Sequence, residues 1–296
     1  MKNREITLNE ISEILHLELI GNECIINGLN LCNKNSIYNS VISYITSIKL
    51  IRYLRENTKI KAVILTQEIY DQMKDEFTHL SFFVSDKPEV KFYDLHTYLF
   101  DSMTFYDSFK FERTMGTNCL IHESADIEDG VIIGNNVVIC RNAVVKKGAI
   151  IGDGSYIGCG SIIGSEGFQL IHDQNGRNRL VQHAGGCRLE KNVFIGDNTT
   201  VCNSLFENTT VIGENTKIDN LVHIAHNCSI GENCVLTAGV ILSGSTIIGD
   251  NVWVAPNSTI SNRVIVENNS FIGIGSVVLR KVKEGTRIFG NPAKEI

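Results

Sequence analysis

The sequence of 296 residues lacks several features that would each point to a different class of protein. No run of about 20 apolar residues occurs, so no segment reads as a membrane-spanning helix. The net charge is -6 and there is no basic block, which argues against a nucleic-acid or membrane-surface footprint. The N-terminal segment MKNREITLNE is polar and does not resemble a secretory signal. Together these absences favour a cytoplasmic globular protein.

The sequence also lacks any C-x-x-C pair, although it contains nine cysteines. Cysteines scattered in this way are compatible with a reducing compartment and do not predict a disulfide framework. We expect most of them to be small residues packed inside the fold.

An aliphatic residue returns at every sixth position over more than half of the chain. The first run extends from Ile121 to Ile163 and the second from Ile212 to Val278. A period of six fits neither an α-helix nor an isolated amphipathic strand, but it fits a hexapeptide β-helix in which each hexad forms one side of a triangular coil. Three hexads make one coil, so residues 18 positions apart should stack. The sequence therefore predicts a parallel β-helix of about eight coils.

The six-residue period also divides the chain into parts. We expect an α/β domain at residues 1–103, which the family resemblance described below implies is nucleotide-binding-like, and a connector at residues 104–118. The β-helix should occupy residues 119–284, with a loop excursion at residues 164–188, and a tail should follow at residues 285–296.

The N-terminal part shows mixed helix and strand signals. A helix should begin near Thr7, with Thr7 or Asn9 as its cap. Residues 41–45 and 61–65 read as strands, and residues 48–54 read as a short helix rich in basic residues.

The excursion between Gly164 and Arg188 replaces the hexad pattern with Gly, Asn, Asp and Gln, so it must leave the β-helix as a loop. A short step through Phe206 then restores the register. Such a long loop on a rigid scaffold points to function, because binding surfaces are built on loops. We expect His172 and His183, both within it, to be surface residues.

The second run contains the densest group of titratable and amide side chains, the string DNLVHIAHN from Asp219 to Asn227. The string favours a functional role for His226, because neutral imidazole can accept a proton near pH 7. For His223 we favour a structural role but keep it as a substrate-binding candidate. Gly244 lies 18 residues after His226 and should stack on it, where the missing Cβ lets its N–H approach an oxyanion; it could also simply occupy a tight corner. Two histidines do not complete a zinc site, so we expect no metal.

The string DNLVHIAHN, the Gly-Phe pair within GSEGF and the N-terminal domain together resemble the UDP-3-O-acylglucosamine N-acyltransferase family of lipid A assembly, over nearly the whole chain. This resemblance implies left-handed coils, an exception to the right-handed rule for parallel crossovers. It also implies a homotrimer with sites in the clefts between subunits.

The resemblance implies roles for individual residues. His226 would be the general base that deprotonates a sugar amine before it attacks a thioester, and Gly244 would donate its N–H to the oxyanion. Asp219 and Asn220 match family positions near the base that orient substrate or imidazole.

The chain departs from this family at several positions. Tyr44 matches one of two aromatic residues that stack uracil, but the second is Leu50. Residues 199–204 read TTVCNS and lack the acidic and basic residues of a TTIDRG-like string. Arg263 replaces a second family histidine, which would change how phosphate or the acyl chain is held. The ending GNPAK, at residues 290–294, resembles sugar acetyltransferases that use coenzyme A.

We therefore favour an N-acyltransferase that moves an acyl group from acyl-CoA to the amine of a nucleotide-linked amino sugar in surface glycan biosynthesis, with no permanently bound cofactor. The first alternative is the lipid A enzyme itself, which takes a hydroxyacyl chain from acyl carrier protein. The second is a non-catalytic hexapeptide scaffold.

Overall fold

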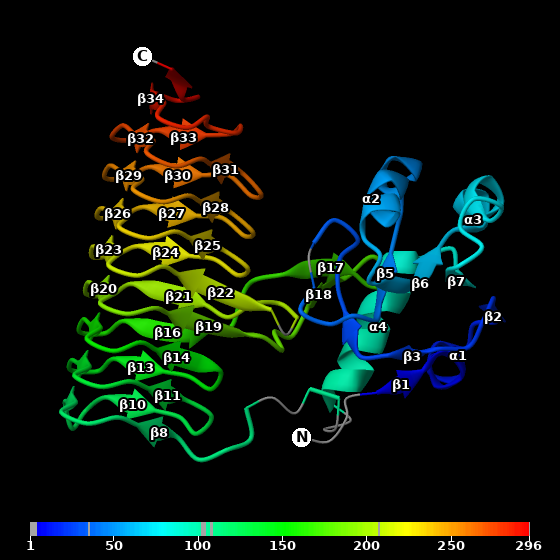
Figure 1. Cartoon of the computed structure of the whole chain (residues 1–296), viewed down its shortest axis with the longest axis horizontal. Coiled ribbons are helices and arrows are strands. Elements are labelled where there is room, and N and C mark those ends of the chain that lie inside the picture. The colour runs from blue at the N-terminus through cyan, green and yellow to red at the C-terminus, as the bar shows by residue number, and fades with distance from the viewer. Residues whose placement is uncertain (1–4, 35, 102–104, 107–108, 207, 296) are drawn as a thin grey trace. The chain divides into compact units, whose positions relative to one another are not determined.

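The computed structural model divides into two compact units (Figure 1). Unit 1 comprises residues 1–107 together with 169–182, and unit 2 comprises residues 108–168 and 183–296. The boundary expected at residues 103 and 104 lies outside the described residues. The structure describes the whole chain except residues 1–4, 35, 102–104, 107–108, 207 and 296.

Unit 1 is a small α/β unit built on a five-stranded sheet with the order β2-β7-β6-β5-β4. Strands β4 to β7 run parallel, and β2 joins β7 antiparallel. The sheet strands are β2 (Leu19–Ile20), β4 (Gly28–Leu29), β5 (Val41–Tyr44), β6 (Ile60–Leu65) and β7 (Ser81–Val84), and a separate pair is formed by β1 (Ile6–Thr7) and β3 (Ile25–Ile26). The helices are α1 (Leu8–Leu15), the 3-10 helix η1 (Ile48–Leu50), α2 (Ile51–Glu56), α3 (Gln67–Met73) and α4 (Pro88–Asp101).

The start of α1 confirms Thr7 as the cap. The Glu10 N–H donates to Thr7 Oγ1 at 3.2 Å, and the Thr7 N–H donates to Glu10 Oε2 at 2.8 Å. This reciprocal capping box satisfies two backbone donors that a helix start leaves open. Among the described residues, no helix is long and apolar enough to cross a membrane.

The middle of the excursion forms a hairpin that belongs to unit 1. Its strands are β17 (Leu170–His172) and β18 (Asn178–Leu180), which pair antiparallel. Arg179 Nη1 contacts Asp94 Oδ1 of α4 at 2.6 Å, with both side chains about one-third exposed. The buried His96 of α4 contacts the Gln182 carbonyl at 2.9 Å through Nε2. Polar contacts with α4 therefore fix both the hairpin and the segment that follows it.

Unit 2 is a left-handed parallel β-helix with three faces, which confirms the predicted fold (Figure 1). Face 1 contains β8 (Thr114–Met115), β11 (Ile132–Ile133), β14 (Ala149–Ile151), β19 (Gly186–Leu189), β22 (Thr209–Ile212), β25 (Ser229–Ile230), β28 (Ile247–Ile248) and β31 (Ile265–Val266). Face 2 contains β9 (Leu120–Ile121), β12 (Val138–Ile139), β15 (Tyr156–Ile157), β20 (Phe194–Ile195), β23 (Lys217–Ile218), β26 (Val235–Leu236), β29 (Trp253–Val254), β32 (Phe271–Ile272), β34 (Arg287–Phe289) and β35 (Lys294–Glu295). Face 3 contains β10 (Asp126–Ile127), β13 (Val144–Val145), β16 (Ile162–Ser165), β21 (Thr200–Cys202), β24 (His223–Ile224), β27 (Ile241–Leu242), β30 (Thr259–Ile260) and β33 (Val277–Val278).

The register of the faces confirms the predicted stacking of residues 18 positions apart. Ile224 pairs with Leu242, and Leu242 pairs with Ile260, all fully buried in one aliphatic core. Two steps are longer, and both lie where the chain passes from face 3 to face 1. Between β16 and β19 the excursion inserts extra residues, and between β21 and β22 residues 203–208 do the same. We call this edge the 3–1 corner.

Corner residues with left-handed backbone allow the chain to turn at each face. Most of these positions hold Asn or Gly, the residues that tolerate positive φ best. Three positions in the coils differ: Leu221, Ser245 and Arg263, with φ of 59°, 61° and 62°. Ser245 and Arg263 lie at the 3–1 corner, in the row that begins with Asn227.

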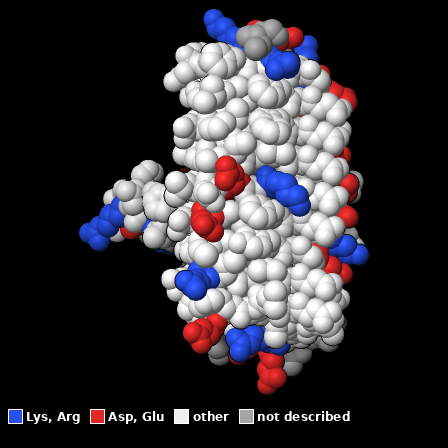
Figure 2. Space-filling model, turned by 90° about the vertical axis from the view of Figure 1, so that its left-hand side faces the viewer, with Lys and Arg blue, Asp and Glu red and all other residues white. Residues whose placement is uncertain are grey.

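The outward side chains of face 2 form a mostly uncharged surface (Figure 2). Tyr156 and Phe194 stack with ring centroids 4.8 Å apart, and Trp253 is 46% exposed. Lys217 is a charged member of the same outward row. Exposed apolar surface of this kind marks interaction sites.

The nine cysteines are all free thiols. Five of them are buried and the other four are half-buried. The five buried cysteines act as small packing residues, in agreement with the prediction that most of the nine do so.

A pair of neighbouring isoleucines on β28 tests which side chains of a strand point into the core. Ile248 is buried and Ile247 is 41% exposed. We expect Ile248→Ala to lower the free energy of unfolding by about 2–5 kcal/mol, because it leaves a cavity in the core. Ile247→Ala should cost less than about 1 kcal/mol. Denaturant titration followed by the fluorescence of the single tryptophan measures both; equal losses would contradict the assignment of faces.

Candidate active site

The 3–1 corner gathers polar groups from consecutive coils. His226 and Asn227 follow β24, Gly244 and Ser245 follow β27, and Arg263 follows β30. One coil on the N-terminal side of His226 is the inserted segment 203–208, and the excursion leaves the β-helix one coil before that. The corner thus carries two longer segments and, in the coils after them, a row of turns with polar side chains.

The imidazole of His226 is fixed by its neighbour. His226 Nδ1 lies 2.8 Å from Asn227 Oδ1, and the Leu205 N–H donates to the same oxygen at 3.1 Å. A backbone N–H can only donate, so this atom of Asn227 is the amide oxygen. Because an amide oxygen can only accept, Nδ1 of His226 carries the proton. In the neutral ring Nε2 is then the basic nitrogen.

Asn227 is itself held by the inserted segment and by the strand β22. Its Nδ2 donates to Ser204 Oγ at 2.5 Å, and its backbone N–H donates to Thr210 Oγ1 at 3.0 Å. Ser204 and Thr210 are fully buried. These supports orient the imidazole through Asn227, as outer residues orient a histidine in many sites.

Gly244 lies directly over the His226 ring, as the 18-residue spacing predicts. A Cβ built on Gly244 would lie 2.7 Å from His226 Nε2, closer than any side chain allows. The N–H of Gly244 donates no hydrogen bond to any residue that the structure describes. Gly244 is buried, and a buried donor without a protein partner is rare, so this N–H is available to a ligand atom.

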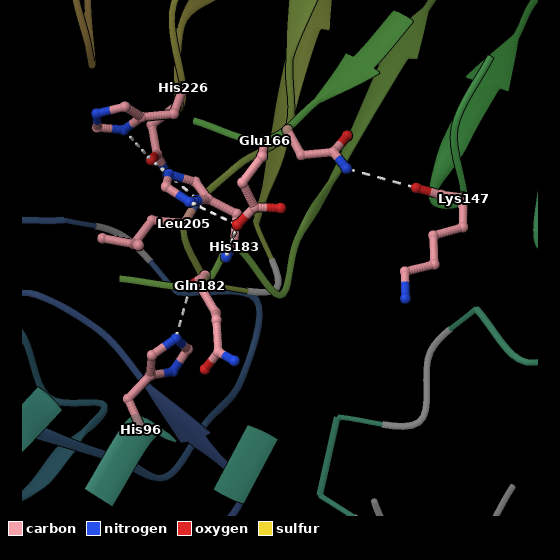
Figure 3. Close-up of polar contacts among 9 residues, drawn as sticks. His96, Lys147, Glu166, Gln182, His183, Leu205 and His226 are labelled. Carbon is pink, nitrogen blue, oxygen red and sulfur yellow. Dashed lines mark hydrogen bonds and ion pairs between the residues drawn. The ribbon is translucent and has the colours of Figure 1, made fainter. Parts of the chain in front are cut away.

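Glu166 and His183 lie where the excursion leaves and rejoins unit 2, and they contact each other (Figure 3). The His183 N–H donates to Glu166 Oε1 at 2.6 Å, and His183 Nδ1 lies 3.3 Å from the same oxygen. Loss of solvation opposes ionisation of Glu166, but these contacts outweigh it and lower the pKa of the carboxyl. His183 is buried, so the expectation of a surface residue was wrong; His172 is exposed.

Asp219 and Asn220 lie at the opposite end of β24 from His226, in the turn between faces 2 and 3. The Asn220 N–H donates to Asp219 Oδ1 at 2.8 Å, and Asn220 Oδ1 accepts from the Asp197 N–H at 2.6 Å. These contacts shape the turn. His223 projects outward between the two corners, where partial loss of solvation lowers its pKa.

Arg263 is exposed at the 3–1 corner, one coil beyond Gly244. Its N–H donates to the Gly244 carbonyl at 3.1 Å, so the backbone places its side chain along the same edge. The left-handed backbone of Arg263 is uncommon for a residue with a long side chain, and such outliers concentrate at functional sites.

Tyr44 belongs to unit 1, at the carboxyl end of β5. Its ring packs against Phe92 of α4 with centroids 4.9 Å apart, and its O–H donates to Glu89 Oε1 at 2.9 Å. Burial, followed by the neighbouring Tyr93 and Glu89, raises the pKa of Tyr44 well above its usual range. Leu50 packs beside the apolar core of the unit.

Sequence reasoning did not assign roles to Asn227, Ser204, Glu166 or His183. Asn227 was visible as the last letter of the string DNLVHIAHN, and Ser204 lies in the short step that restores the register. Only the fold could bring Glu166 and His183 together, because 17 positions separate them. In the described part of the chain, no group of three or more His, Cys, Asp or Glu side chains could hold a metal ion.

Comparison with known proteins identifies the repeats. Residues 209–244 and 245–280 match the family described as Bacterial transferase hexapeptide (six repeats). Over 67 residues the chain is 45% identical to the UDP-3-O-acylglucosamine N-acyltransferase of Campylobacter lari, and over 66 residues it is 44% identical to that of Helicobacter pylori. These segments cover 23% and 22% of this chain and 21% and 19% of those relatives, so the match spans about a fifth of their length.

A solved structure supports the same fold. The UDP-N-acetylglucosamine acyltransferase of Bacteroides fragilis superposes with a TM-score of 0.55 at 24% identity. The match covers 62% of this chain and 70% of that chain. Over its repeats the chain is thus similar to the hexapeptide transferases and to the UDP-3-O-acylglucosamine N-acyltransferases.

A double-mutant cycle tests the contact between Gly244 and His226. Gly244 has no positive φ, and the three atoms nearest to an alanine Cβ there all belong to the His226 imidazole. We expect Gly244→Ala to lower the free energy of unfolding by about 1–3 kcal/mol, because the methyl group overpacks the site. In the His226→Ala background the loss should disappear. Denaturant titration of the four proteins measures the coupling, and additive losses would show that the ring does not lie over Gly244.

Proposed function

Because the β-helix carries the hexapeptide repeats of bacterial transferases, we propose that this protein moves an acyl group from an acyl thioester to the amine of a nucleotide-linked amino sugar. One observation carries the proposal. His226 directs its basic nitrogen to Gly244, whose N–H has no partner among the described residues, while Asn227 fixes the tautomer.

The reaction follows from these groups. His226 Nε2 takes a proton from the sugar amine, whose lone pair attacks the thioester carbonyl carbon. The oxygen becomes negative, and the Gly244 N–H stabilises it. The carbon–sulfur bond then breaks, the electron pair leaves on sulfur, and the thiolate takes the proton from the His226 imidazolium. The products are an amide and a thiol.

For the acceptor, we propose that Tyr44 stacks the nucleotide base and that Arg263 binds a phosphate or acyl group of the substrate. We propose that Asp219 and Asn220, in the turn before β24, and His223, on β24, contact the sugar. An exposed arginine suits phosphate recognition because its guanidinium offers a fork of donors.

For the donor, we favour acyl-CoA. Residues 279–283 follow β33 at the 3–1 corner and, with Val278, Thr286, Ile288 and residues 292–295, line a cavity of about 400 Å³. Its basic side chains are those of Arg280, Lys281, Lys283 and Lys294. The cavity lies three coils from His226 on the same edge, or about 14 Å at ~4.8 Å per coil. Its size and charge suit the phosphates of coenzyme A.

The second candidate is the reaction named for the relatives, acylation of UDP-3-O-acylglucosamine, with acyl carrier protein as donor. Identity of 45% to the Campylobacter lari enzyme over 67 residues favours it. The two candidates share the chemistry at His226 and differ in carrier and acceptor.

Turnover with each donor separates them. We expect amide formation from acyl-CoA and an amino sugar nucleotide, measured by thiol release with matched acyl carrier protein reactions alongside. His226→Ala should lower kcat by about 10²–10⁴-fold, the usual contribution of a general base. The control His172→Ala, on the exposed hairpin, should retain activity. Full activity of His226→Ala would refute the assignment.

A substitution in the basic cavity tests whether that cavity binds acyl-CoA. Arg280→Glu should raise KM for acyl-CoA several-fold without lowering kcat, since it removes charge remote from the reacting atoms. Turnover only with acylated acyl carrier protein would contradict the proposal that acyl-CoA is the donor.

We also propose a homotrimer in which coils of neighbouring chains pack together through apolar faces such as face 2. Light scattering should then give a mass of about three times the chain mass of 32.8 kDa. Trp253→Glu should reduce it, because burying a charge in such an interface is costly. A wild-type mass of one chain would contradict the trimer.

A further inference from the structure

The two ends of the excursion, where it leaves and rejoins the β-helix, carry the carboxylate of Glu166 and the buried imidazole of His183 close to His226. Glu166 lies just after β16 and His183 lies three residues before β19. The His183 side chain is fully buried, whereas the Glu166 side chain is 60% exposed. Two contacts from one residue converge on Glu166 Oε1, through the backbone N–H and Nδ1 of His183. The two side chains thus hold each other in place, with the negative charge of Glu166 on the solvent-exposed side of the pair.

The ring of His183 contacts the ring of His226. Their centroids are 5.2 Å apart, and the planes meet at 64° (Figure 3). Gly167 makes room for this arrangement, because a Cβ there would collide with His183 Nε2. His226 is also bound by Asn227, through its Nδ1. The ring of His226 is therefore contacted by an amide and by a second imidazole.

We propose that His183, fixed by Glu166, is a positioning residue for His226, and that the pair stabilises the positive charge that His226 acquires when it accepts a proton. His183 holds the plane of the neighbouring ring, and the Glu166 carboxylate supplies a negative charge that favours imidazolium over imidazole. This inference rests on the proposed function of His226 as the base. Glu166 and His183 themselves form no bond to substrate.

The charges around the pair agree with this arrangement. Burial, together with the negative charge of Glu166, raises the pKa of the Cys202 thiol to about 11. Lys146 also acts on Glu166 and helps to keep it ionised. The field of the carboxylate thus extends into the buried part of the corner, where screening by water is weak.

A purely structural role of the Glu166–His183 contact would be to hold the two ends of the excursion together. The loop also has an anchor of that kind inside unit 1, the ion pair of Arg179 with Asp94. This anchor offers a matched comparison, since it joins two segments through one carboxylate without a ring contact to His226. A variant there should affect the loop and not the titration of the base.

The test is an NMR titration of the full-length protein with ¹³C-labelled histidine, with the His226 and His183 signals assigned from His226→Asn and His183→Asn. Glu166→Gln keeps an oxygen for the His183 N–H and removes only the charge. We expect it to lower the midpoint of His226 by about 0.5–1 pH unit, since losing a nearby carboxylate disfavours the charged imidazole. Glu166→Asp should restore most of the shift, and Asp94→Asn should leave the midpoint unchanged.

The readouts separate this inference from the proposed reaction. An unchanged His226 midpoint in Glu166→Gln, or an equal shift in Asp94→Asn, would overturn the inference whatever the activity. Where wild-type turnover is measured, Glu166→Gln should lower kcat several-fold with KM retained, and the acid limb of the pH profile should move to lower pH. A shifted midpoint in a protein without transferase activity would support the coupling and refute the proposed function instead.

Discussion

The stacking of residues 18 positions apart is the constraint on which the rest of the β-helix depends. Each inward aliphatic side chain contacts its equivalents in the coils on either side, and burying one contributes about 1.5–3 kcal/mol relative to leaving it exposed. Because parallel strands pair along every face, a coil cannot shift by one residue without turning its core side chains outward. A residue at a corner is therefore fixed relative to its neighbours in adjacent coils.

The site at the 3–1 corner follows from this rigidity. Ile224 and Leu242 are paired in the core, so His226 and Gly244, which follow each of them by two positions, must also meet. The stacked turns bring the imidazole of His226 next to Gly244, and Asn227 sets the tautomer. Backbone register thus performs the alignment that other proteins achieve with separate loops.

The periodic part of the chain could be predicted from sequence because its physics is local and repeated. Spacing alone predicted the coils of the β-helix and the meeting of His226 with Gly244, whereas the left hand of the coils was implied by the family resemblance. The burial of His183 could not be predicted, since it depends on how a 25-residue segment without a period returns to the coil. The role of Asn227 depends on contacts with Ser204 and Leu205, which lie more than 20 positions away. The roles of Tyr44, Asp219, Asn220, His223 and Arg263 remain predictions.

Both insertions in the β-helix occur at one corner, and after each of them the core resumes its pairing. Ile163 still pairs with Val201 across the excursion, and Val201 pairs with Ile224 across residues 203–208. The stability of the core therefore depends little on how long the segments inserted at this corner are. A lineage could lengthen, shorten or exchange these segments and so change what the site accepts, while the inherited scaffold folds as before. Substrate range and foldability can evolve separately in such a molecule.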